Sequence, residues 1–136
     1  MNTKPRRVMQ LTVTTADKPG ILAEITSVLA KDKINIEAIC AYGDETEAIC
    51  YLIVRNNEKA KKALKASGWD VKEEEVVVID LENNPGALNT IANKLKKLNV
   101  NLRYCYGTTT EAAGPCHFVL KATDNDLAVN ALSSSK

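Results

Sequence analysis

The chain has 136 residues, with 18 Lys and Arg against 17 Asp and Glu, so its formal net charge is +1. This near-neutral balance argues against a nucleic-acid-binding protein, which needs a basic surface to attract phosphates. Aromatic residues make up only 4% of the chain, and it contains a single histidine, His117. Stacking surfaces for single-stranded nucleic acids and most histidine-dependent catalytic or metal chemistry are therefore not expected.

The start of the chain carries charges but no apolar stretch of the length found in a signal peptide. No run of residues approaches the roughly 18 apolar residues of a membrane span. We therefore expect a cytoplasmic protein that binds neither a membrane nor nucleic acid.

The first half of the chain predicts a strand, a helix and two further strands. Residues 9–15 alternate between apolar and polar side chains, which is typical of a half-buried strand. Apolar residues then recur at helical spacing from Ile21, which predicts a helix that ends near residues 31–33. Residues 34–42 and 48–55 predict two strands joined by a polar turn.

A second helix follows Asn57, which is a good N-cap residue, and stops at Gly68, since glycine favours a helix C-terminus. A fourth strand starts at Trp69. This order, βαββαβ, is that of a split βαβ, or ferredoxin-like, unit of the α+β class. Right-handed crossovers place both helices on one face of its antiparallel sheet. The other face is left to water or to a partner.

The chain then repeats itself with an offset of 66 residues, because Pro19-Gly20 recurs as Pro85-Gly86. The further matches lie at turn and core positions, which define a fold, and they pair Leu22 with Leu88, Ile25 with Ile91, Leu29 with Leu95 and Asn35 with Asn101. Two copies of a unit this long indicate tandem domains rather than a solenoid. We place the first domain at residues 1–74 and the second at residues 75–136.

The second copy predicts the same elements up to its second helix, over residues 75–81, 86–98, 100–107, 116–122 and about 125–132. No sequence remains after this helix for a fourth strand, so we expect the second unit to lack its last strand. The apolar run from Val76 to Ile79 is typical of a strand covered on both faces. We therefore expect protein on the open face of the second sheet.

The Pro-Gly loops are the best candidates for a binding site. Each loop follows a strand and opens a helix, whose first N–H groups lack helical partners and favour negative charge. Glycine lets a ligand approach the backbone closely, which suits a small carboxylate. Asp17 could cap its helix or accept an ammonium group, whereas the second loop has Asn83 in its place. The alternative is that both loops are only tight turns.

The cysteines offer a weaker candidate site. Cys40 and Cys50 should lie roughly opposite each other across one hairpin, as should Cys105 and Cys116 across the other. In the cytoplasm these thiols stay reduced, and none forms a C-x-x-C pair. We interpret them as small buried apolar residues, and we expect no metal and no cofactor.

A strand, then D-x-P-G-x-L, an apolar helix and a strand that opens with x-N-I resembles the ACT domain, a regulatory module that binds amino acids. The matching residues are Asp17, Pro19, Gly20, Leu22 and Ile34-Asn35-Ile36, and then Pro85, Gly86, Leu88 and Val100-Asn101-Leu102. The resemblance covers about residues 8–132 and is nearest to stand-alone tandem-ACT proteins. It implies ligands held at interfaces between ACT units, with the backbone amides of the loop on the ligand carboxylate.

The resemblance carries the family's binding positions onto two segments and two asparagines of this chain. They are Asp17, Lys18, Pro19, Gly20, Ile21, Leu22 and Asn35 in the first copy, and Asn83, Asn84, Pro85, Gly86, Ala87, Leu88 and Asn101 in the second. The two asparagines have an equally good alternative, because Asn is common where a helix returns into a strand and tolerates the left-handed conformation.

The resemblance implies a non-catalytic regulatory protein, most simply a homodimer, which binds a small amino acid and regulates a partner metabolic enzyme. An enzyme is not expected, because the sequence offers no pairing of a nucleophile with a base and no phosphate loop. The alternative is a dimerisation or scaffold protein of ferredoxin-like fold that binds no ligand.

Overall fold

The computed structural model describes residues 4–109 and 115–133. Along the chain its elements are β1 (Arg6–Ala16), α1 (Ile21–Lys31), β2 (Ile36–Gly43), β3 (Glu47–Val54), α2 (Asn57–Ala66), β4 (Asp70–Glu82), α3 (Ala87–Lys97), β5 (Leu102–Thr109), β6 (Pro115–Ala122) and α4 (Asn125–Ser133). They form two compact units, one of Met9–Glu74 and one of Met1–Val8 with Glu75–Lys136. No helix among the described residues is long and apolar enough to cross a bilayer.

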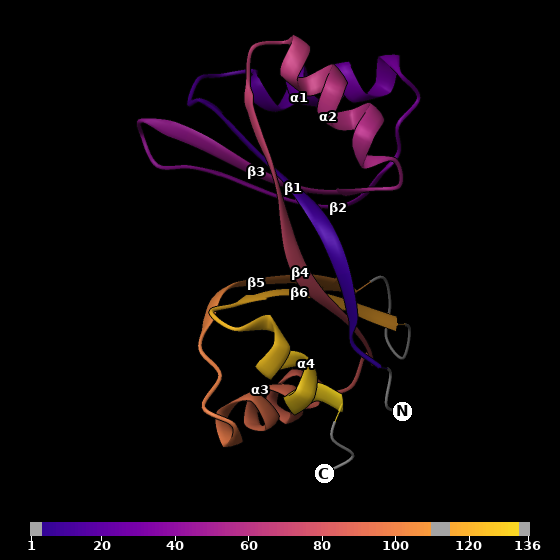
Figure 1. The fold of residues 1–136 in the computed structure, drawn as a ribbon, viewed down its shortest axis with the longest axis vertical. Helices are drawn as coiled ribbons and strands as arrows, with labels where there is room; N and C mark the ends of the chain where they lie inside the picture. Colours follow the sequence, from indigo (N-terminus) through magenta and orange to yellow (C-terminus); the bar gives the residue numbers. More distant parts are fainter. Residues whose placement is uncertain (1–3, 110–114, 134–136) are drawn as a thin grey trace. The chain divides into compact units, whose positions relative to one another are not determined.

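The unit of residues 9–74 has the strand order β2-β3-β1-β4, with β3 antiparallel to both β1 and β2. Both of its helices, α1 and α2, lie on one face of this sheet (Figure 1). Between sheet and helices lies a core that includes Leu11, Leu29, Leu52 and Leu64, all fully buried. The alternation in β1 that predicted a half-buried strand therefore directs Leu11 and Val13 towards the helices.

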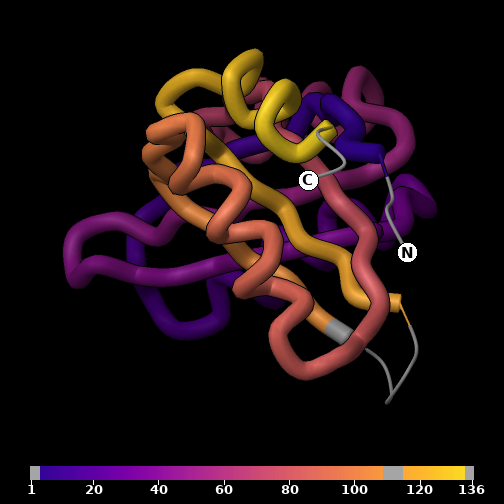
Figure 2. Tube along the Cα trace, turned by 90° about the horizontal axis from the view of Figure 1, so that it is seen from below, coloured from indigo at the N-terminus to yellow at the C-terminus, as the bar shows by residue number. Residues whose placement is uncertain are grey.

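The other unit has the strand order β1-β4-β6-β5, with β6 antiparallel to both β4 and β5. Its helices α3 and α4 run beside each other in front of the strands (Figure 2). Ile91 and Leu95 of α3 and Leu132 of α4 are buried against Ile79 and Leu120 of the sheet. This core is the counterpart of the first one, since Ile91 and Leu95 lie 66 residues after the buried Ile25 and Leu29 of α1.

The beginning of the chain lies at the sheet position where the second unit was expected to lack a strand. Within the described residues, which end at Ser133, no strand follows α4, and the absence of a last strand stays a prediction. The sheet position beside β4 is nevertheless filled, because the first residues of β1, Arg6–Val8, belong to this unit. The sequence analysis placed Arg6–Val8 in the first domain, because it set the boundary between the two copies at residue 74. A strand finds its partner through long-range hydrogen bonding, which sequence proximity does not reveal.

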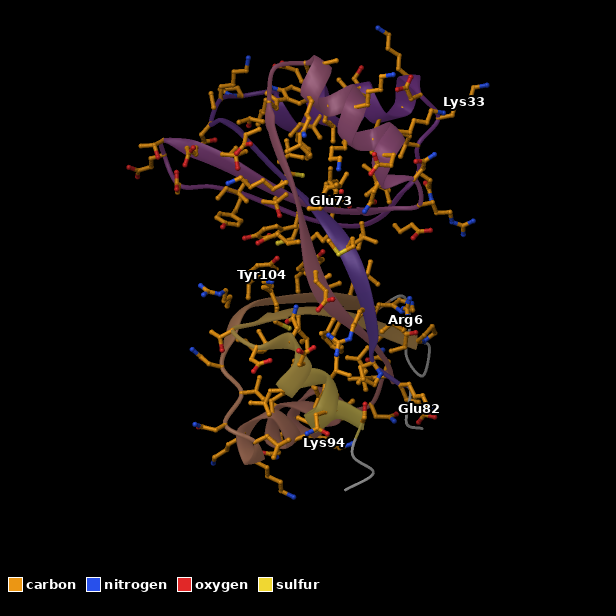
Figure 3. The ribbon with its side chains drawn as sticks, viewed as in Figure 1. Arg6, Lys33, Glu73, Glu82, Lys94 and Tyr104 are labelled. Atoms are coloured by element: carbon orange, nitrogen blue, oxygen red, sulfur yellow. The ribbon has the colours of Figure 1, made fainter. Side chains whose placement is uncertain are left out.

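Ion pairs attach this N-terminal segment to the second unit. The Arg7 guanidinium lies 3.1 Å from Glu75 and 2.7 Å from Asp126, and the hydrogen bond that it donates to Asp126 is the main cause that raises the pKa of Arg7. Arg6, labelled in Figure 3, lies 3.4 Å from Asp80 on the neighbouring strand. The two adjacent arginines thus use different acidic partners, as expected where side chains alternate between the faces of a strand.

In the first unit, the last strand is the first part of β4, and it is held in place differently from the N-terminal segment. There the first part of β4 contributes Val71, which is only 4% exposed, to the hydrophobic core. In the N-terminal segment, by contrast, Arg6 and Arg7 are exposed and Val8 is only partly buried. Backbone pairing and charge therefore hold Arg6–Val8 in place, with little help from apolar burial.

The apolar run in β4 is buried along its whole length. Val77 and Ile79 face the helices in the second core, whereas Val76 and Val78 alternate with them and point to the opposite face. All four are buried, Val76 and Val77 completely.

We predict that Arg7→Ala loosens the N-terminal segment without unfolding the rest of the chain, because it removes both ion pairs to Glu75 and Asp126. Hydrogen exchange should become faster at the backbone amides of residues 6–8 and remain unchanged in the core strand β3. Arg103→Ala, which removes another exposed arginine, is the matched control. Unchanged protection of residues 6–8 in Arg7→Ala would show that the ion pairs do not hold the strand.

Candidate functional site

The two Pro-Gly loops have the same backbone geometry. Gly20 and Gly86 both have φ 88°, with ψ −2° and −5°, and each stands directly before its helix. The Gly20 carbonyl accepts a hydrogen bond from the Glu24 N–H at 3.0 Å, and the Gly86 carbonyl accepts one from the Thr90 N–H at 3.0 Å. These are left-handed conformations that glycine adopts without strain, which explains why the Pro-Gly pair recurs.

Both helix starts lack a side-chain cap. No side chain hydrogen-bonds to the first turn of α1 or of α3 as an N-cap. Helix α2 differs, since the Asn56 side chain accepts a hydrogen bond from the Lys59 N–H at 3.1 Å. Asn56 is thus the N-cap that the sequence analysis placed one residue later, at Asn57. The Ile21 and Ala87 N–H groups donate to the loop carbonyls of Lys18 and Asn84. No side-chain oxygen caps the first turn of α1 or α3, and a helix N-terminus of this kind favours an anion.

Asp17 does not cap α1, which corrects one of its two expected roles. Its carboxylate instead accepts a hydrogen bond from the Glu45 N–H at 3.3 Å, in the turn between β2 and β3. Gly43 makes this contact possible, because a Cβ there would lie within 2.7 Å of the Asp17 carboxylate. The sequence offered only a weak signal for this pairing, a glycine at the start of a polar turn. Asp17 thus joins the loop to the adjacent hairpin.

The second loop lines a cavity of about 480 Å3 at the start of α3. Its walls include Glu82, Asn84, Gly86, Thr90 and Lys94, and Glu82 and Lys94 are labelled in Figure 3. The Asn84 side chain donates a hydrogen bond to the Glu82 carboxylate at 3.2 Å, and the Asn84 backbone carbonyl accepts one from the Ala87 N–H at 3.1 Å. The predicted residues Asn84, Pro85, Gly86 and Ala87 are therefore brought together around one hollow.

The leucines of the two motifs are exposed, at 49% for Leu22 and 44% for Leu88. Their neighbours Ile21 and Ala87 instead pack against the two cores. Lys18 lies in the first loop, where its carbonyl accepts the Ile21 N–H at 3.3 Å. Each loop thus presents an apolar side chain to its surroundings beside the uncapped N–H groups.

Asn35 and Asn101 stand apart from the loops, at the returns from α1 and α3 into the next strands. Neither has a positive φ, so the expected left-handed role is wrong for them. Lys33 and Asn99 take that conformation instead, both with φ 58°, and Figure 3 labels Lys33. The Asn101 carbonyl accepts the Thr123 N–H at 3.0 Å, which ties this return to the end of β6.

The predicted cysteine pairs are wrong, because the strand register separates them. Cys40 lies opposite Tyr51, whereas Cys50 lies opposite Ala41, so the two side chains point to different faces. Cys105 lies opposite Leu120, and Cys116 lies opposite Thr109. In the part of the chain that the structure describes, no group of His, Cys, Asp or Glu side chains could hold a metal ion.

His117 takes part in a side-chain network around Asp80. Its Nδ1 lies 2.6 Å from the Asp80 carboxylate, which also accepts a hydrogen bond from Arg6 at 3.4 Å. These contacts join β6, β4 and the N-terminal segment, and all three side chains are partly exposed. Its place in the fold is therefore structural, next to the strand that completes the second unit.

Comparison with known proteins identifies a domain family for part of the chain. The family model of the AHAS small subunit-like ACT domain matches residues 11–67. No curated protein sequence matches the chain.

Solved structures match almost the whole chain. Protein BT0572 from Bacteroides thetaiotaomicron is 31% identical, with a TM-score of 0.86 over 96% of this chain and 89% of that one. The ligand-free regulatory subunit of aspartate kinase from Thermus thermophilus is 16% identical, with a TM-score of 0.68 over 97% of each chain. The corresponding subunit from Thermus flavus is 13% identical, with a TM-score of 0.63 over 96% of this chain and 95% of that one. The two Thermus matches show a shared fold.

We predict that Cys50 is unreactive in the folded protein. Burial, and secondarily the nearby Cys40, raises the pKa of its thiol to about 11. At pH 8 only about a thousandth of the thiol is then ionised, and the thiolate is the nucleophile. Alkylation at pH 8 followed by mass spectrometry should leave Cys50 unmodified in the native chain and modify it in denaturant. Rapid native labelling would contradict this burial.

The raised pKa of the Cys50 thiol also predicts how the stability of the protein depends on pH. The unfolded thiol loses its proton near pH 9 while the folded one retains it to about pH 11. The unfolded state therefore binds fewer protons, and the free energy of unfolding should fall between pH 9 and 11. Chemical denaturation of Cys50→Ala should lack this part of the decline, and an identical pH profile in wild type and variant would exclude the effect.

Proposed function

The chain belongs to the ACT domain family, and we propose on this basis that it is a non-catalytic regulatory protein built of two tandem ACT units. It binds a small amino acid at the Pro-Gly loops and thereby regulates a partner metabolic enzyme. The fold it shares with regulatory subunits of aspartate kinase supports a regulatory role. The protein acts in the cytoplasm as a homodimer.

The observation that carries this proposal is the pair of uncapped helix starts with the same left-handed glycine. A ligand carboxylate would accept hydrogen bonds from first-turn N–H groups, as anions do at helix N-termini. The glycine leaves space above the backbone, because a Cβ at Gly20 or Gly86 would meet no atom within 4 Å. The exposed Leu22 and Leu88 offer apolar contact beside each loop.

The two loops would differ in the side chains that they offer to the ammonium group of the ligand. The first has the Asp17 carboxylate close by, although Glu45 N–H already binds it. The second has Asn83 at that place, and Glu82 and Asn84 line its cavity. Different affinities for one amino acid, or different amino acids, follow from these side chains.

Regulation requires that the ligand prefers one of two states. A ligand shifts an equilibrium only by its differential affinity for the two states. In a protein without catalytic residues, the change that a partner enzyme detects must be in packing or assembly. Sites at interfaces between ACT units would couple the ligand to such a change.

We predict that at least one amino acid raises the melting temperature of the protein. At about 100 times its dissociation constant, a ligand of the native state adds about 2.7 kcal/mol to the free energy of unfolding. The experiment is a thermal-shift screen of the twenty amino acids at millimolar concentration. No shift with any of them would favour the alternative, a dimerisation or scaffold protein without a ligand.

We further predict that Gly20→Asn or Gly86→Asn weakens the binding of such a ligand at least tenfold. Asparagine tolerates the left-handed backbone, and its side chain would enter the open space over the helix start. The two substitutions are matched controls for each other, because each changes one unit. Full affinity in both variants would place the ligand away from the Pro-Gly loops.

The proposed homodimer predicts a mass of about twice the 14.8 kDa of one chain in multi-angle light scattering. The measurement should be made with and without the amino acid found in the screen, since the ligand is expected to change assembly or packing. A single-chain mass at micromolar concentration under both conditions would contradict the dimer.

A further inference from the structure

Helix α2 concentrates positive charge in a chain that is nearly neutral. Four of its ten residues are lysines, Lys59, Lys61, Lys62 and Lys65, against one acidic residue, Glu58, whereas the whole chain has a formal net charge of +1. Lys59, Lys62 and Lys65 are exposed, and together with Lys61 they line much of an open groove of about 600 Å3. We call Lys59, Lys62 and Lys65 the lysine face.

The fourth lysine of the helix is neutralised within the first unit, but the lysine face is not. The Lys61 ammonium lies 2.5 Å from Glu73 and 3.5 Å from Glu58, and its hydrogen bond to Glu73 is the main cause that raises the pKa of Lys61. Glu73, labelled in Figure 3, also accepts a hydrogen bond from Asn57 at 3.2 Å. Among residues 4–109 and 115–133, the lysine face has no acidic partner within ion-pair distance.

The charges of the lysine face repel one another. Lys59 and Lys62 are three residues apart, as are Lys62 and Lys65, so each pair lies side by side on the helix surface. Like charges at this spacing destabilise a helix. Lys59 also lies in the first turn, where the helix dipole disfavours a cation. An anionic partner that lies along the lysine face would therefore relieve a repulsion that exists in the free protein.

The fold of a unit does not require these lysines, because the equivalent helix α4 lacks them. Helix α4 follows α2 at an offset of 68 residues, and the buried Ala60 and Leu64 correspond to Ala128 and Leu132, which are also buried. At the lysine positions the helix surfaces differ. Lys59, Lys61, Lys62 and Lys65 correspond to Leu127, Val129, Asn130 and Ser133. The positive charge is thus a property of the first unit alone and not of helix packing.

The surroundings of the lysine face favour a protein partner over a membrane or a nucleic acid. The apolar side of α2, with Ala60 and Leu64, is buried in the core, so the helix has no apolar face to insert into a bilayer. No aromatic side chain lines the groove, which leaves a nucleic-acid base nothing on which to stack. Carboxylates suit the lysines of this helix, as the pairing of Lys61 with Glu73 shows.

We propose that the lysine face is a docking surface for an acidic segment, rich in Asp and Glu, of the partner enzyme. The three ammonium groups of the face bind carboxylates of this segment, while Lys61 keeps its pairing with Glu73. A helix of this length spans about 15 Å, which about five residues of an extended chain can cover. The inference rests on the proposed regulation of a partner enzyme and adds the surface that would hold this enzyme.

The test uses a fluorescently labelled oligoglutamate of about ten residues, long enough to cover the helix. It is titrated into the full chain and followed by fluorescence anisotropy. Binding is expected at low salt, and it should weaken at least tenfold between about 20 mM and about 200 mM salt, because exposed charges are screened. A DNA duplex and vesicles of phosphatidylserine and phosphatidylcholine are titrated in parallel as the other two classes of anionic partner.

A triple variant locates the surface. Lys59→Gln, Lys62→Gln and Lys65→Gln together should weaken oligoglutamate binding at least tenfold, because all three charges of the face are lost. Glutamine is as good a helix former as lysine, and the three side chains are exposed, so the variant should stay folded, which thermal unfolding checks.

The matched control removes three exposed lysines from other helices. It combines Lys31→Gln of α1 with Lys96→Gln and Lys97→Gln of α3, which changes the net charge by the same amount. The control should bind oligoglutamate like the wild type, since a contact with the lysine face does not depend on net charge alone.

The outcomes separate the docking surface from amino-acid binding. The surface is supported if the triple variant loses oligoglutamate and the control keeps it. It is overturned if the triple variant binds like the wild type, if both variants weaken binding equally, if the wild type does not bind at low salt, or if DNA or the vesicles bind the lysine face more tightly than oligoglutamate. A thermal-shift screen of the same variants tests amino-acid binding separately. No shift with any amino acid in the wild type would overturn the amino-acid part of the proposed function and leave the oligoglutamate result intact.

Discussion

The pairing of the chain's first residues with β4 is the constraint on which the second unit depends. A strand edge exposes N–H and C=O groups that need partners, and β4 would present such an edge without Arg6–Val8. The repeat cannot therefore be divided at residue 74 into two self-contained pieces. Backbone pairing with β4 and the ion pairs of exposed arginines, with little burial of apolar side chains, hold this strand.

The left-handed glycines determine what the loops can offer. A glycine with φ 88° turns the chain from strand to helix within a few residues, and it brings no side chain to cap the helix. Helices α1 and α3, which begin at the same place in the repeat, both lack a side-chain cap, whereas Asn56 caps α2. The repeat thus leaves the starts of both α1 and α3 without a side-chain cap.

The two units share a backbone and differ in side chains. The repeat pairs charged residues of the first unit with uncharged residues of the second. With the 66-residue offset, Asp17 corresponds to Asn83, Lys18 to Asn84 and Glu24 to Thr90. The charged side chains that line the hollows beside α1 and α3 therefore lie at different places in the repeat: Lys18 and Glu24 in the first unit, and Glu82 and Lys94 in the second. Divergence of this kind keeps the fold, which depends on core positions, and changes what each unit can recognise.

By itself, the sequence determined the local structure and the repeat. Periodicity and turn residues depend on neighbours along the chain. They therefore predicted the helix after Gly20, the end of a helix at Gly68 and the 66-residue offset of the repeat. Only the tertiary structure decided which distant groups meet: Arg7 with Asp126, and Asp17 with the Glu45 N–H. These contacts depend on strand register and on chain closure over long separations, which no local pattern encodes.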